Sequence, residues 1–271
     1  MSASTNSAAH RFFEALWADY IQRTPSASKV HEVLGEGHEI INDHVAFRTF
    51  NIAPVNLAAL TGHFEAMGYF ANGDYAFEQK KLRAKHFEHS DPTLPKIFIS
   101  ELLVEEFSPA LQKIVQDMVA SINAAEVTNP EFLYSGTHWQ VSHQQYEQLL
   151  EESEYAAWMS AFGFCANHFT VSVNELPGYS TLESVNQKLK DSGFTLNASG
   201  GEIKGSPEVF LEQSSTMADH IPVQFSDGEA VIPSCFYEFA KRYEIADGKL
   251  YTGFVAASAD KIFESTNAKK A

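Results

Sequence analysis

The sequence is poor in cysteine and has no long apolar run. Cys165 and Cys235 are the two cysteines among 271 residues, which excludes a disulfide framework and a CxxC metal motif. The longest apolar stretches, such as KIFISELLV, are far shorter than the ~20 residues of a membrane-spanning helix. The start, MSASTNSAAHRFFEALW, lacks the apolar core of a secretory signal. We therefore expect a cytoplasmic protein without a membrane partner, in which both cysteines are buried thiols.

Basic residues are also scarce. The chain has 19 Lys and Arg against 35 Asp and Glu, a formal charge of -16. A surface of this sign repels phosphate backbones, so nucleic acid is excluded as a partner. Hydrophobic residues make up 44% of the chain, which is typical of a globular protein. We expect one compact domain over residues 1–271.

A repeated order of elements organises the chain. An N-terminal helical region is followed by a strand with period two, DHVAFRTF, then by the helical stripe NLAALTGHFEAMGYF and by further strands around the breaker SDPTLP. In the second half, the strand ANHFTVSV, the helix STLESVNQKLKDSGF and several strands follow in the same order. The sequence thus predicts two βαβββ-type modules, at residues 43–106 and 163–258.

The region between the modules, residues 107–162, predicts a helical insert. Two amphipathic patterns, SPALQKIVQDMVASINAAE and HQQYEQLLEESEYAAWMSAF, fit helices that pack across the sheets. The fold class is therefore α+β, with two fused modules that form a curved sheet around a metal cleft and with additional packing helices. After Lys261 we expect a frayed tail.

Three side chains are candidates for one metal site. His44 and His168 occupy equivalent positions near the start of the first strand of each module. Glu238, in CFYEFAKRY, shares a strand face with Phe236 and Ala240, so its carboxylate is buried and needs a partner. Two histidines and one carboxylate form the facial set used by non-haem Fe(II) oxygenases. We predict that the three side chains bind one divalent metal.

Arg48 lies on the same strand face as His44, roughly 13 Å further along the backbone. A guanidinium at that place can bind a substrate carboxylate bidentately, so Arg48 is the predicted catalytic and substrate-binding residue. Ser215 is a weaker candidate for substrate binding. His138 and His220 are weaker candidates for the surroundings of the pocket.

Structural alternatives stand beside each of these roles. A single strand histidine is more often a core residue than a ligand. Glu238 could instead pair with Lys241 or Arg242 at the surface. Arg48 could serve only to neutralise a buried carboxylate such as Glu101 or Glu238.

Four strings in this order, DHVAFRTF, ANHFTVSV, LEQSSTMAD and CFYEFAKRY, resemble the hydroxyglutarate synthase family, named for 2-oxoadipate dioxygenase/decarboxylase. That family is similar to the vicinal oxygen chelate superfamily, whose βαβββ modules match the repeat. The resemblance implies Fe(II) as the metal, ligands at His44, His168 and Glu238, and a substrate-carboxylate arginine at Arg48.

The implied reaction uses a 2-oxo acid and O2. The acid chelates the iron, and oxidative decarboxylation is followed by hydroxylation, so that 2-oxoadipate gives 2-hydroxyglutarate and CO2. This chain is shorter than the characterised bacterial members, which carry extra segments around the substrate pocket. Two alternatives stay open: an oxygen-independent metal lyase, isomerase or hydrolase of the glyoxalase type, and a small-molecule binding protein without catalysis.

Overall fold

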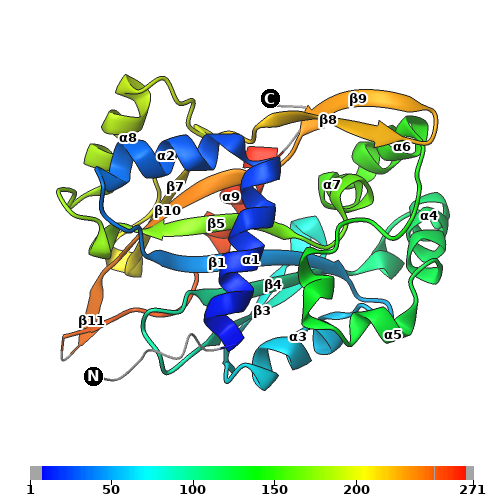
Figure 1. Ribbon diagram of the computed structural model, residues 1–271, viewed down its shortest axis with the longest axis horizontal. Coiled ribbons are helices and arrows are strands. Elements are labelled where there is room, and N and C mark those ends of the chain that lie inside the picture. The colour runs from blue at the N-terminus through cyan, green and yellow to red at the C-terminus, as the bar shows by residue number, and fades with distance from the viewer. Residues whose placement is uncertain (1–7, 247, 267–271) are drawn as a thin grey trace.

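The computed structural model describes residues 8–246 and 248–266 and is built on one eight-stranded sheet, in the order β2-β3-β4-β1-β5-β10-β7-β6 (Figure 1). The strands of its first half are β1 (Asn42–Phe50), β2 (Phe70–Phe77), β3 (Leu82–Glu88) and β4 (Lys96–Leu102). Those of its second half are β5 (Ala166–Ser172), β6 (Lys204–Ser206), β7 (Leu211–Ser215) and β10 (Phe236–Arg242).

Each half repeats one topology. In the first half β1 runs parallel to β4, and in the second half β5 runs parallel to β10. The two halves meet where β1 pairs with β5 in antiparallel register. The crossover helices are α3 (Leu57–Ala66) and α8 (Leu182–Asp191). The predicted fold class of two fused βαβββ modules in a common sheet is confirmed, whereas the exact module boundaries stay a prediction.

Local sequence explains where the crossover helices begin. The side chain of Asn56 accepts a hydrogen bond from the backbone N–H of Ala59 and caps α3. Thr181 caps α8 in the same way through the N–H of Ser184. Each helix thus starts at a capping residue of the loop that follows the first strand of its half.

Helices cover both faces of the sheet, which is why its central strands read as buried over nearly their whole length. In Figure 1, α1 (Ala8–Arg23) crosses in front of the central strands β1 and β5, α2 (Pro25–Gly35) lies next to α1, and α9 (Ala256–Ile262) lies behind the sheet. Cys165 and Cys235 are both buried free thiols, as predicted. Among the described residues, the helices are too short or too polar to cross a bilayer.

The helical insert differs from the prediction in one respect. It contains α4 (Pro109–Ala120), α5 (Ala124–Val127), α6 (His143–Glu152) and α7 (Glu154–Phe162). The second amphipathic pattern is two helices rather than one, because Ser153 takes an extended conformation and its side chain caps α7 by accepting from Ala156 N–H. The break changes the direction of the chain and brings α7 against β1.

The remaining elements lie outside the main sheet. They are the hairpin β8 (His220–Phe225) and β9 (Gly228–Pro233), the small pair β11 (Glu244–Ala246) and β12 (Lys249–Leu250), and the 3-10 helices η1 (Glu78–Lys80), η2 (Val104–Glu106), η3 (Pro130–Tyr134), η4 (Val173–Glu175), η5 (Pro207–Val209) and η6 (Phe263–Thr266).

The chain after Lys261 is not frayed where it is described. Ile262, Phe263, Ser265 and Thr266 are all buried, so that prediction is wrong for residues 262–266, while residues 267–271 lie outside the described residues. Burial of the apolar pair Ile262 and Phe263 stabilises this packing by removing their surface from water. We refer to residues 254–266, which include α9 and η6, as the C-terminal segment.

Candidate metal centre

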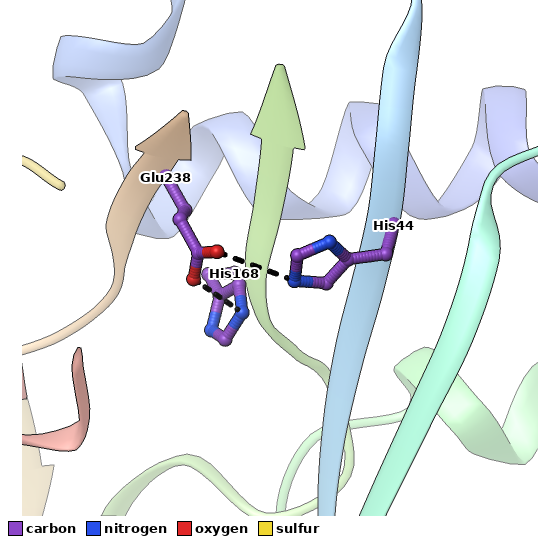
Figure 2. Close-up of side chains that lie close together, drawn as sticks. All are labelled: His44, His168 and Glu238. Carbon is purple, nitrogen blue, oxygen red and sulfur yellow. Dashed lines mark ion pairs between the residues drawn. The ribbon is translucent and has the colours of Figure 1, made fainter. Parts of the chain in front are cut away.

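The three predicted ligands converge in space. His44, His168 and Glu238 come from the neighbouring strands β1, β5 and β10, and the register places all three side chains on one face of the sheet. One Glu238 oxygen lies 3.4 Å from His44 Nε2, and the other lies 3.2 Å from His168 Nε2 (Figure 2). One nitrogen or oxygen atom from each residue lies within 4.8 Å of the others. The geometry therefore brings together the set that the sequence predicted.

Hydrogen bonds fix how the two imidazoles face this centre. His44 Nδ1 lies 2.8 Å from Asp43 Oδ1, and because an ionised carboxylate can only accept, Nδ1 is the protonated nitrogen. His168 Nδ1 lies 3.0 Å from Asn167 Oδ1 in the same arrangement. Both Nε2 lone pairs therefore point toward Glu238, whose oxygens are also acceptors when the carboxylate is ionised. Acceptors that face one another in a buried site need a cation or a proton between them.

Burial sets the charge state of these groups. It is the main cause that lowers the pKa of His44 and of His168, so both imidazoles are neutral, as metal ligands must be. It also raises the pKa of Glu238 to about 8, against the opposing hydrogen bond from Gln213. Thr170 Oγ1, 3.1 Å from His44 Nε2, and Gln213 Nε2, 2.6 Å from Glu238 Oε1, are the neighbouring polar atoms. This donor set fits a divalent metal.

The alternative pairing of Glu238 at the surface is wrong. Glu238 is 1% exposed, so its carboxylate is not at the surface at all. Arg242 is buried as well and pairs with Asp43 instead. Lys241 lies three residues from Glu238 along β10. Because successive side chains of a strand alternate between faces, Lys241 points to the opposite face of the sheet.

The centre opens into a very small cavity of about 20 Å³. Its polar lining consists of the three candidate ligands and Gln213, and its apolar lining consists of Phe98, Phe254, Ala259, Ile262 and Phe263. A cavity of this size holds about one water molecule. Most of its apolar wall comes from the C-terminal segment, which therefore closes the centre.

Arg48 lies in an aromatic cage at the other side of this wall. Its guanidinium carbon is 4.9 Å from the ring centres of both Tyr155 and Trp158 and 5.6 Å from that of Phe263. Phe263 also lines the metal cavity, so its ring lies next to both Arg48 and the centre. The sequence did not predict that α7 contributes Tyr155 and Trp158 to this cage, and the capping residue Ser153 was the local signal of a separate helix.

The polar partners of Arg48 also differ from the predicted alternatives. Its Nη1 donates to Glu154 Oε1 at 2.9 Å, and its Nη2 donates to Thr266 Oγ1 at 3.1 Å. Glu101 pairs with Arg83, so neither Glu101 nor Glu238 is the carboxylate that Arg48 neutralises. The Nε atom of Arg48 is buried without a hydrogen-bond partner among the described residues.

The weaker candidates Ser215, His138 and His220 do not line the metal cavity. Ser215 is opposite Glu238 in the sheet, but its hydroxyl lies 2.9 Å from Ser265 Oγ, and its role in substrate binding stays a prediction. His138 is 2.7 Å from Ser135 Oγ in the helical insert, and His220 is exposed. Neither histidine lines the metal cavity, and a place for one of them near the pocket stays a prediction.

Comparison with known proteins adds to this geometry. The family model described as 2-oxoadipate dioxygenase/decarboxylase matches residues 12–249. The chloroplastic 2-oxoadipate dioxygenase/decarboxylase of Arabidopsis thaliana is 34% identical over 97% of this chain and 80% of its own length.

Two crystal structures are similar over nearly the whole chain. Hydroxyglutarate synthase of Oryza sativa, in complex with 2-oxoadipate, is 34% identical, covers 99% of this chain and 98% of its own, and has a TM-score of 0.88. A candidate hydrolase of Shewanella frigidimarina NCIMB 400 is 61% identical, covers 93% of this chain and 99% of its own, and has a TM-score of 0.90. Since the family model spans all eight strands of the main sheet, this chain belongs to the 2-oxoadipate dioxygenase/decarboxylase family.

Proposed function

We propose that this chain is a dioxygenase and decarboxylase that converts a 2-oxo dicarboxylic acid, such as 2-oxoadipate, to 2-hydroxyglutarate and CO2. The observation that carries the proposal is the convergence of His44 Nε2, His168 Nε2 and both oxygens of Glu238 on one buried point. Family membership and the rice relative in complex with 2-oxoadipate support the substrate class. A cytoplasmic location stays a prediction, and the Arabidopsis relative is chloroplastic.

The metal in this proposal is Fe(II), held by His44, His168 and Glu238. Two histidines and one carboxylate leave coordination positions open, and Fe(II) supplies the activation of O2 there. The chain supplies neutral imidazoles, a carboxylate that offsets part of the metal charge, and an apolar wall that excludes water from the reaction.

The proposed reaction balances without a further reductant. One oxygen atom of O2 enters the new carboxylate that forms at the former keto carbon. The other is inserted into a C–H bond of the neighbouring methylene carbon, and the hydrogen of that bond ends on the new hydroxyl. The bond between the first carboxyl carbon and the keto carbon breaks, and that carboxyl leaves as CO2. The electrons that reduce O2 come from the acid itself.

Arg48 is the proposed anchor for a carboxylate of the substrate. Its charge is permanent, its guanidinium is buried, and its present partners are Glu154 and a threonine hydroxyl rather than a bidentate carboxylate. A six-carbon diacid does not fit in a cavity of about 20 Å³. The wall of the cavity therefore has to move when substrate binds, and in this proposal the C-terminal segment, which supplies most of the apolar wall, moves aside. Arg48 then exchanges Thr266 for the substrate carboxylate.

Oxygen uptake tests the proposal. The protein is purified without oxygen, loaded with Fe(II), and mixed with 2-oxoadipate or with shorter and longer 2-oxo acids in an oxygen electrode. We expect one CO2 released for each O2 consumed, and 2-hydroxyglutarate as the product from 2-oxoadipate. The absence of uptake with every 2-oxo acid, from protein that holds stoichiometric iron, would reject this reaction.

A second candidate is an oxygen-independent hydrolase or glyoxalase-type reaction at the same three side chains. The observation that favours it is the Shewanella structure, which is 61% identical and is described as a candidate hydrolase. Turnover that continues without O2 and with Zn(II) in place of iron would select it. Stoichiometric ligand binding without turnover in either assay would instead favour a binding protein.

A further inference from the structure

A buried ion pair lies directly behind His44. Asp43 Oδ1 lies 2.8 Å from His44 Nδ1, and the same carboxylate accepts two hydrogen bonds from Arg242, at 2.6 Å from Nε to Oδ2 and at 2.8 Å from Nη2 to Oδ1. The side chains of Asp43 and Arg242 are 4% and 3% exposed. This bidentate contact fixes the Asp43 carboxylate in the orientation in which it accepts a hydrogen bond from the N–H of His44.

The other half of the molecule has no equivalent of this pair. Asn167 takes the place of Asp43 and is neutral, and its Nδ2 has no hydrogen-bond partner among the described residues. The register pairs His44 with Lys96 and His168 with Phe236, so the first-half counterpart of Arg242 is Leu102. The ion pair is therefore a feature of one ligand, not a consequence of the repeated fold.

Arg242 also holds the chain that leads into the C-terminal segment. Its Nη1 donates to the carbonyl oxygens of Tyr251, at 3.0 Å, and Gly253, at 2.8 Å. The next residue, Phe254, packs its ring 5.2 Å from the guanidinium carbon and perpendicular to the His44 ring at 4.8 Å. One guanidinium thus contacts the support of a candidate ligand and the start of the segment that closes the centre.

We infer that Asp43 and Arg242 are positioning residues of the metal centre. They hold His44 with Nδ1 protonated and Nε2 free for the metal, and they fix the start of the C-terminal segment over it. The inference rests on the proposed function, because it needs a metal at His44. Partners of this kind orient the ligand and make it more basic, and their loss typically lowers metal affinity about 10–100-fold.

The first test needs no variant. Histidine labelled with ¹⁵N in the metal-free wild-type protein reports which ring nitrogen of His44 carries the proton, and addition of Zn(II) reports which nitrogen binds. We expect a protonated Nδ1 in both states and a Zn(II) shift at Nε2. A protonated Nε2 in the metal-free protein, or Zn(II) at Nδ1, would overturn the inference.

The second test measures Zn(II) affinity by chelator competition for Asp43→Asn, Arg242→Gln and the double variant. We expect each single change to weaken binding about 10–100-fold. The double variant should be little weaker than either, because the two residues act as one unit. Arg83→Gln is the matched control. Arg83 also pairs with a buried carboxylate, Glu101, but it contacts no candidate ligand. The Zn(II) affinity of this variant should therefore equal that of the wild type.

The outcomes separate the inference from the function on which it rests. If the wild type binds no metal, the proposed function fails. If the wild type binds Zn(II) and Asp43→Asn binds it within about twofold, only the positioning role fails. A purely structural role predicts a lower melting temperature with unchanged affinity, so both are measured on each variant. If the variants do not fold, the tautomer of His44 in the wild-type protein still tests the inference, because a protonated Nε2 would overturn it.

Discussion

In the first half of the sheet, β4 carries Phe98 at the place where β10 of the second half carries Glu238. The same register makes Ser172 on β5 the counterpart of Arg48 on β1. Each half therefore supplies one imidazole at the same position, but the carboxylate comes from the second half and the arginine from the first. Duplication accounts for the convergence of the histidines, and divergence of the two copies accounts for the chemistry around them.

Removing each histidine in turn has the largest expected effect and tests whether the two halves of the sheet contribute equally to the metal centre. We expect His44→Ala and His168→Ala to lower metal content from one ion per chain to essentially none, because both contribute one Nε2 to the same point. His138→Ala, in the helical insert, is the control and should keep its metal. Elemental analysis after anaerobic purification checks this. A stoichiometric ion in either ligand variant would show that the halves do not contribute equally.

The difference between Arg48 and Ser172 gives the next largest effect. Arg48→Ala should raise KM for the 2-oxo acid about 10–100-fold, since a hydrogen bond to a charged group contributes about 1.5–3 kcal/mol. Its metal content should not change, and Ser172→Ala should alter neither quantity. Arg48→Lys keeps the charge without the bidentate geometry, so its KM should lie between those of the wild type and Arg48→Ala. Loss of metal from Arg48→Ala would contradict the separate roles of anchor and ligand.

The smallest effect concerns how the C-terminal segment is tied to the two halves. Thr266 accepts from Arg48 on β1, whereas the Ser265 hydroxyl lies 2.9 Å from Ser215 Oγ on β7. Thr266→Val frees Nη2 of Arg48, while Nη1 stays bonded to Glu154, and it weakens the closed form. KM should therefore fall about 2–5-fold, which corresponds to one hydrogen bond of about 0.5–1 kcal/mol.

Ser265→Ala is the comparison for that change. It also loosens the segment but leaves Arg48 in its present contacts, so it should lower the melting temperature without lowering KM. Steady-state kinetics and thermal unfolding of both variants distinguish the two ties. A higher KM in Thr266→Val would mean that Thr266 helps to bind the substrate rather than competing with it.

The sequence alone was sufficient for the fold class and for the meeting of His44, His168 and Glu238. The strand period placed each side chain on a face, and the repeat placed the two histidines at matching positions. These signals are local or periodic. They needed only the additional assumption that the two modules share a sheet, which the pairing of β1 with β5 confirms.

What the sequence did not predict depends on contacts between distant segments. Arg48 meets Glu154 106 residues away, and Asp43 meets Arg242 199 residues away, so no local pattern reports either pair. The C-terminal segment did carry a signal, since Ala259, Ile262 and Phe263 have helical apolar spacing. Its brevity and its position near the end of the sequence made fraying the default expectation.

The fluorescence of Trp158 can report on what binds to Arg48 in the aromatic cage. Its indole lies 4.9 Å from the guanidinium carbon of Arg48, and the sequence contains three tryptophans in all. Indole emission responds to nearby charge and to water, so a carboxylate that reaches Arg48 should change the fluorescence at once. Occupancy of the anchor can therefore be followed in protein without iron or oxygen, independently of any catalytic turnover.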